Sequence, residues 1–324
     1  MSAAPVRDSP LAAVLAAAAA MIAGSAMAVQ GHSNGVLAGI VGSGILAATV
    51  SFAGGLAVLI VVCAAWPSAR RGIGRARRLV AAGQFPWFML LGGVGGSLIV
   101  ISQSLTVPLF GVSIFTMAFV CGQLGGALLV DNTDLPPGGR RHPTLPRLAG
   151  TGIVLAGVVV SSAGVFGQGI AWWAPLLPLI AGVGTAFQQA FNGRLKAAAN
   201  SAAAATFTNF LVGTVFLAVC SALVLATGTP VRGAPELPAQ WWTLIGGVLG
   251  VVFIGVSTLT VARLGVLLLS LTTLFGNLAG SLVTDVITGS AATALAPSTL
   301  IAMGLVLVGV CVASVPGRPL GRLR

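Results

Sequence analysis

Two stretches of the chain, IAGSAMAVQGHSNGVL (22–37) and IAGVGTAFQQAFNGRL (180–195), align without a gap when the sequence is shifted by 158 residues. Extended to 35 positions from residue 22, this alignment contains 12 identities. A shift of 154 residues aligns 87–131 with 241–285 and contains 16 identities in 45. Glutamine, asparagine, tryptophan and aspartate recur as well as alanine, so an alanine-rich composition does not explain the match. The sequence therefore predicts an internal duplication.

The composition excludes a soluble globular protein and a disordered one. Of 324 residues, 56% are hydrophobic and 6% are charged, whereas about a quarter of an average soluble domain is charged. So few charges cannot cover a soluble surface, and the low hydrophobicity of a disordered chain is absent. The chain is therefore expected to be an integral membrane protein, with the lipid bilayer as its surroundings.

Ten apolar runs are long enough to cross a bilayer as helices, because lipid leaves no water for unpaired backbone groups. Five runs fall in residues 1–168 and five in 169–324, and an odd number inverts the second half relative to the first. The predicted fold is all-α, with ten transmembrane helices in two inverted-topology five-helix repeats. The runs are 11–31, 36–65, 86–106, 109–130, 148–167, 172–190, 202–226, 241–262, 264–288 and 298–316.

The few charges segregate by side when the ten runs are counted as spans. Fifteen of the 16 lysines and arginines fall on the side of the N-terminus, and Arg232 is alone on the other side. The positive-inside rule then places both termini in the cytoplasm. An alternative is that Arg7 and the small-residue stretch ending at Ala28 form a cleaved signal peptide, which would leave nine spans. The counterpart of this segment in the middle of the chain favours its retention.

Several motifs occur once in each half. QGHSNGVL (30–37) is repeated as QQAFNGRL (188–195), and a tryptophan precedes a double glycine at 87–93 and at 241–247. The other pairs are LTVPLFG with LTVARLG and GQLGGALLVD with GNLAGSLVTD. From about residue 20 to 316 the chain resembles the YdcZ-like branch of the drug/metabolite transporter superfamily, in a fused two-repeat form.

This resemblance implies an inner-membrane protein of ten helices with a central cavity, of a type often assigned to the export of small metabolites. The first four helices of each half would line the path, and the fifth and tenth would pack at the periphery. The resemblance implies no particular substrate.

Uncharged polar residues are the candidates for a substrate path. Gln30 and Asn34 are four residues apart and share a helix face, as do Gln188 and Asn192. Each pair is either a gate at one mouth of the cavity or a polar helix end followed by an Asn-Gly turn. The further candidates, which line a path or join helices by hydrogen bonds, are Gln103, Gln123, Asn209 and Asn277.

Asp285 is the acidic residue with apolar neighbours on both sides, in SLVTDVITG, and its repeat counterpart is Asp131. An ionisable group inside a membrane is a candidate for proton coupling, although an aspartate that ends a helix at the interface is also common. The first and sixth runs contain no carboxylate. A proton-coupled exporter of hydrophobic cations is therefore disfavoured, and a neutral or zwitterionic cargo fits better.

The leading functional hypothesis is a secondary transporter that exports a small metabolite by alternating access. The alternative is a non-transporting membrane scaffold or accessory subunit. With two histidines, both expected in loops, and isolated cysteines, we expect no enzyme active site, no metal and no cofactor. A nucleic-acid partner is not expected either, and a homodimer stays open as an assembly.

Overall fold

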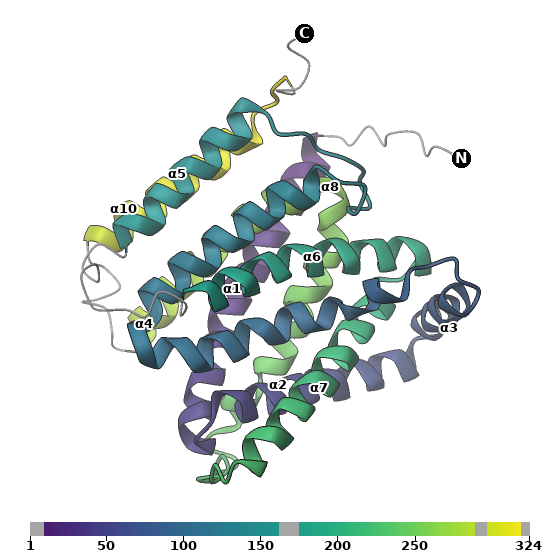
Figure 1. The fold of residues 1–324 in the computed structure, drawn as a ribbon, viewed down its shortest axis with the longest axis vertical. Coiled ribbons are helices and arrows are strands. Elements are labelled where there is room, and N and C mark those ends of the chain that lie inside the picture. The colour runs from purple at the N-terminus through teal and green to yellow at the C-terminus, as the bar shows by residue number, and fades with distance from the viewer. Residues whose placement is uncertain (1–9, 162–174, 289–296, 319–324) are drawn as a thin grey trace.

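The computed structural model of the chain describes residues 10–161, 175–288 and 297–318. Within these ranges the chain is helical and contains no β-strand. Short 3-10 turns at Trp87–Leu91 and Trp241–Leu244 precede the two longest helices. The helices are α1 (Pro10–Val41), α2 (Gly44–Ala65), α3 (Pro67–Ala81), α4 (Gly92–Asp131), α5 (Leu145–Ser161), α6 (Leu176–Ala199), α7 (Ala202–Ala226), α8 (Gly246–Ile287) and α10 (Pro297–Ser314) (Figure 1).

Membrane-spanning character is confirmed for much of the described chain. Three apolar stretches are shorter: 87–103 and 115–131, which are the first and last parts of the segment formed by the 3-10 turn and α4, and 145–160 in α5. α6 does not reach the same hydropathy, because its second half contains Gln188, Gln189 and Asn192. Five helical stretches are long and apolar enough to cross a membrane: Pro10–Val41, Gly44–Ala65, Ala202–Ala226, Trp241–Ile287 and Pro297–Ser314. The predicted boundary between halves at 168/169 lies outside the described residues.

The first and sixth runs end later than the sequence predicts. We expected helix ends near residues 31 and 190, but α1 continues through Asn34-Gly35 to Val41, and α6 continues to Ala199. The helices end instead where Gly42 (φ 87°) and Asn200 (φ 50°) adopt left-handed backbone conformations. Serine side chains directly after them cap the next helices, so the true breaks are the Gly-Ser and Asn-Ser steps. The interpretation of the two Asn-Gly steps as turns that follow a helix end was therefore wrong.

α4 and α8 each correspond to two predicted runs. In α8 the helix is broken at Gly265 (φ 76°, ψ 173°), close to the predicted boundary at 262–264. Figure 1 shows α4 as two legs that meet at a bend. A left-handed glycine interrupts a helix without the steric penalty that a side chain would add, and the two segments of α8 can therefore run in different directions.

Helix packing follows the repeat. α1 packs along α8 and α6 packs along α4, while α2 pairs with α7 and α5 with α10. Repeat-related glycines make these approaches close: a Cβ on Gly276 would meet the Met21 backbone, and a Cβ on Gly122 would meet the Leu179 backbone. Small residues at helix contacts are how membrane helices gain packing area. α5 and α10 lie side by side at the edge of the bundle (Figure 1), as the resemblance implies.

Candidate functional site

A small cavity lies at the centre of the bundle, between helices from both repeats. Its volume is about 110 Å³, and its polar lining is made of four amide side chains, namely Gln30, Asn34, Gln103 and Gln188. Phe52 and Phe210, which are repeat counterparts, line the same cavity with their ring centroids 5.1 Å apart. Three of these amides come from the predicted gate pairs, so the fold brings α1, α4 and α6 candidates to one place.

A larger cavity of about 540 Å³ adjoins the first. Gln123 and Asn277, which are repeat counterparts, both line it, together with Asp285. Gln103 lines both cavities, as do Met27, Gly31, Ile99 and Phe253. The two spaces therefore form one hollow whose polar groups are mostly uncharged amides and hydroxyls.

Two of the predicted path residues line neither cavity. Asn209 is 1% exposed, accepts a hydrogen bond from Gln188 Nε2 at 3.4 Å, and donates to Asn192 Oδ1 at 3.2 Å. Asn192 and Asn209 therefore form a buried amide chain behind Gln188, which is the member that lines the cavity. Their visible role is to hold Gln188 in position.

The corresponding amides of the first repeat are less constrained. Ser51 occupies the place that Asn209 has in the second repeat. Asn34 Oδ1 and Ser51 Oγ are buried, and neither has a hydrogen-bond partner in the described part of the chain. The two repeats thus differ beside the smaller cavity: Gln188 is backed by a hydrogen-bonded amide chain, whereas Asn34 lines the cavity with an unpaired acceptor and the Ser51 hydroxyl behind it is unpaired within the described residues.

A group of charged side chains joins the end of α4, the following loop and the break in α8 at one end of the bundle. Asp131, fully buried at the end of α4, accepts from the Val266 amide at 2.7 Å and the Leu267 amide at 3.1 Å. Its carboxylate also pairs with the Arg147 guanidinium. Arg141 donates to the carbonyls of Ala262 and Arg263, on the other side of the Gly265 break. We call this set, Asp131, Arg141, Arg147 and the Gly265 break, the latch.

The latch matches each charge to a helix end. A carboxylate stabilises the N-terminus of the second α8 segment, and a guanidinium stabilises the C-terminus of the first. Sequence reasoning assigned these arginines only to topology and treated Asp131 as a helix end, so it missed the latch. The available signal was that LTVARLG contains a glycine between two apolar runs.

The latch lies in what we call the cation end of the bundle: α3, the end of α6, the 132–144 loop and the α8 break. Arg194 in α6 donates to the Asp134 carbonyl, which ties that loop to α6. The Arg140 guanidinium hydrogen-bonds the exposed Asp134 carboxylate, and this lowers the pKa of that carboxyl. Arg232 lies at the opposite end, where its amide donates to the Val41 carbonyl at 3.0 Å.

Asp285 lies at the end of the bundle away from the latch. It is 20 residues beyond the Gly265 break in the same helix, a distance of about 30 Å at the usual rise per residue. Its side chain is half-buried and lines the larger cavity. Among the described residues no hydrogen bond to its carboxylate is present, in contrast with Asp131 at the same repeat position.

Comparison with known proteins places the chain in a family. A solved structure titled "Crystal structure of protein" has 22% sequence identity, covers 94% of this chain and 97% of its own, and superposes with a TM-score of 0.65, which shows a shared fold. No match was found among curated proteins. A family model matches residues 15–160 and 173–312, one segment in each half. The chain therefore belongs to the family described as "Putative inner membrane exporter, YdcZ".

Proposed function

We propose that this protein is a secondary transporter that exports a small neutral or zwitterionic metabolite. The observation that supports this best is the central hollow, in which amides from both repeats line adjoining cavities of about 110 and 540 Å³. Sites for small molecules are mostly apolar clefts with a few convergent polar groups. Amides both donate and accept, so they can bind a polar solute that has no net charge.

The arrangement of repeats and charges supports a ten-span, inverted topology with cytoplasmic termini. The pairing of α1 with α8 is repeated by α6 with α4, as expected when two copies of one unit are related by a two-fold axis in the membrane plane. Arginines gather at the cation end, and Arg232 lies at the other. We infer that the cation end faces the cytoplasm.

The two aspartates suggest how the hollow opens alternately. The latch closes the cation end, while Asp285 faces the larger cavity without a partner among the described residues. Gly111, Val112 and Asp285 repeat Gly265, Val266 and Asp131. We infer that Asp285 caps the helix segment after Gly111 in the opposite state, when Asp131 releases Val266.

Thiol labelling tests this exchange. Gln103→Cys, in a chain whose native cysteines are replaced, reports which side reaches the hollow. Asp131→Asn is expected to increase labelling from the cation end, and Asp285→Asn is expected to increase labelling from the far end. If both variants increase labelling from the same end, the aspartates do not act as alternating latches.

Transport itself is tested with purified protein in proteoliposomes and a mixture of labelled neutral and zwitterionic metabolites. We expect saturable flux that falls at least tenfold in Asn34→Ala and Gln123→Ala. Gln84→Ala, which removes an exposed amide outside both cavities, is the matched control. Absence of saturable flux, with a membrane protein complex that dissociates when this chain is deleted, would support the scaffold alternative instead.

We further propose that Asp285 couples transport to protons, because it is the carboxylate that lines the hollow. Asp285→Asn is expected to remove the dependence of flux on a pH gradient while saturable exchange of substrate continues. Unchanged pH dependence in this variant would leave Asp285 with a role in gating only.

A further inference from the structure

α3 is an amphipathic helix at the cation end of the bundle. Figure 1 shows it nearly end-on at the edge of the molecule, while α4 and α6 run across the view. Its buried face is made of the small residues Ala69, Gly72 and Ala76, and Gly72 lies against Ser201 at the start of α7. Its other face contains five exposed arginines: Arg70, Arg71, Arg75, Arg77 and Arg78. The helix is therefore held to the bundle by its small residues and presents its basic face outward.

No carboxylate neutralises this basic face within the described residues. Asp131 pairs with Arg147, and Asp134 pairs with Arg140. Asp285 and Glu236 make no ion pair with an α3 arginine, and none is present in the described ranges. The positive-inside rule favours basic residues in such a segment but does not explain why several of them line one hollow.

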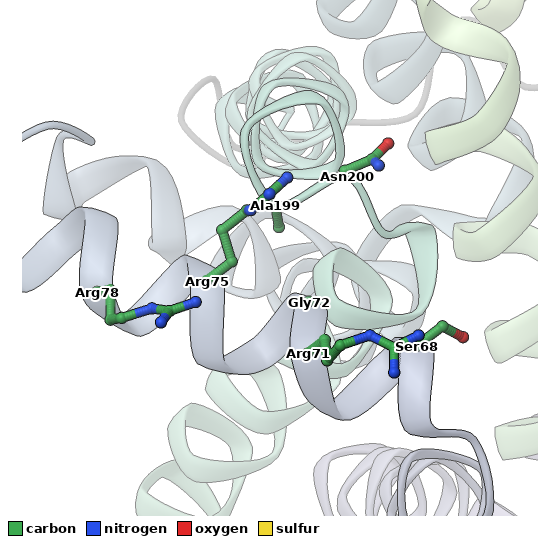
Figure 2. Close-up of a pocket in the computed structure, with 7 residues that line it drawn as sticks. All are labelled: Ser68, Arg71, Gly72, Arg75, Arg78, Ala199 and Asn200. Atoms are coloured by element: carbon green, nitrogen blue, oxygen red, sulfur yellow. The ribbon is translucent and has the colours of Figure 1, made fainter.

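Three of the arginines line the same hollow. Arg71, Arg75 and Arg78 recur every three to four residues and line a separate hollow of about 280 Å³ between α3 and the end of α6, which we call the α3 hollow. Figure 2 shows Arg75 extending toward Asn200 and Arg71 lying beside Ser68. The hollow therefore combines three guanidinium groups with neutral hydrogen-bonding groups at its rim.

The tryptophans next to α3 indicate its depth in the membrane. Trp66, directly before α3, is 62% exposed, and Trp87, six residues after its end, is 67% exposed. Tryptophan side chains favour the boundary between headgroups and acyl chains. The α3 hollow is thus expected to lie at the depth of the lipid phosphate groups.

We propose that this hollow binds the phosphate headgroup of an anionic phospholipid, at a site separate from the transport path. Guanidinium groups match phosphate oxygens in bidentate geometry, and a surface with excess positive charge attracts anionic lipid over zwitterionic lipid. Bound lipid would fix α3 against α6 and α7. The proposal does not depend on the transport function, because none of its residues lines the central cavities.

Native mass spectrometry and thermal unfolding of the detergent-purified chain test the proposal with phosphatidylglycerol, phosphatidylcholine and inorganic phosphate as separate additions. We expect retained phosphatidylglycerol adducts and a raised melting temperature, little effect of phosphatidylcholine, and weakening at high salt. The triple variant Arg71→Gln/Arg75→Gln/Arg78→Gln is expected to lower the affinity for phosphatidylglycerol at least tenfold. The control Arg140→Gln/Arg232→Gln removes two arginines outside α3 and is expected to bind as the parent does.

Three results would contradict the proposed lipid site. Equal phosphatidylglycerol binding by the triple variant and the control would place the lipid elsewhere. Stabilisation by millimolar phosphate equal to that by phosphatidylglycerol would identify a soluble anion as the ligand. If the triple variant fails to fold, Arg75→Gln alone, which removes the guanidinium group that extends toward Asn200, is expected to weaken binding several-fold, and unchanged binding would contradict the proposal.

Discussion

Replacing Arg147 with methionine removes the side-chain partner of a fully buried carboxylate. Asp131 is 0% exposed, and the Arg147 side chain is 10% exposed. Breaking such a pair from one side costs about 3–5 kcal/mol, because the remaining charge is buried without compensation. The two amides of Val266 and Leu267 still hydrogen-bond Asp131, so we expect a value near the lower limit, about 3 kcal/mol.

This cost corresponds to a measurable change in melting temperature. For a chain of this size roughly 2 °C is lost per kcal/mol, so the expected decrease is roughly 6 °C at that ratio. The decrease in melting temperature is measured by tryptophan fluorescence of the detergent-purified chain, which has six tryptophans. Methionine keeps much of the arginine stem, so the variant removes the guanidinium group, its ion pair with Asp131 and the hydrogen bond that it donates to the Arg141 carbonyl at 2.7 Å.

Two further variants separate the charge effect from general damage. Asp131→Asn/Arg147→Met removes both charges and is expected to recover more than half of the lost stability, because no uncompensated ion remains. Arg140→Met breaks the exposed pair with Asp134 and is expected to leave the melting temperature nearly unchanged. A double variant as unstable as the sum of its single variants, or an Arg147→Met variant as stable as Arg140→Met, would refute this account of the latch.

Three other predictions concern backbone and packing. Gly265→Ala forces a side chain into a left-handed position beside Arg141, so we expect lower thermal stability, whereas Gly255→Ala in the same helix, whose Cβ would make only an ordinary contact with Thr206 at 3.8 Å, is expected to be neutral. Gly276→Ala, whose Cβ would meet the α1 backbone, is expected to cost about 1–3 kcal/mol in unfolding measurements, and Gly39→Ala, which has no neighbour, is its control. Phe210→Ala, at a side chain 2% exposed, is expected to cost about 3–5 kcal/mol, and a near-zero value would show that the ring pair is not packed as described.

Much of the fold was predictable because membrane helices have a strong local signal. α7 occupies 202–226, the predicted run, since its apolar residues begin after a capping serine and end at a loop. The ends of α1 and α6 were mispredicted by about ten residues. Polar and glycine residues near 31–35 resemble a turn in the sequence, but inside the bundle they face a polar hollow and the helix continues.

The sequence predicted the chemical type of the residues that line the candidate site, but not which of the candidate residues line it. Amides recurring at repeat positions identified Gln30, Gln123 and Asn277, which the fold places around one hollow. The same reasoning included Asn209, which instead hydrogen-bonds Gln188 and Asn192. Spacing along a helix shows which residues share a face, but it does not show whether that face meets a cavity or another helix.

By itself the sequence determined the membrane environment, the duplication and the helical class, because these follow from composition, hydropathy and self-similarity along the chain. Only the tertiary structure decided that Asp131 and Asp285, at one repeat position, have different surroundings. The buried Asp131 carboxylate accepts a hydrogen bond from the Val266 amide directly after the helix break at Gly265, whereas Asp285 lines the larger cavity. The physical reason is that a carboxylate's role depends on donors brought from distant helices, and those donors have no signature next to it in the sequence.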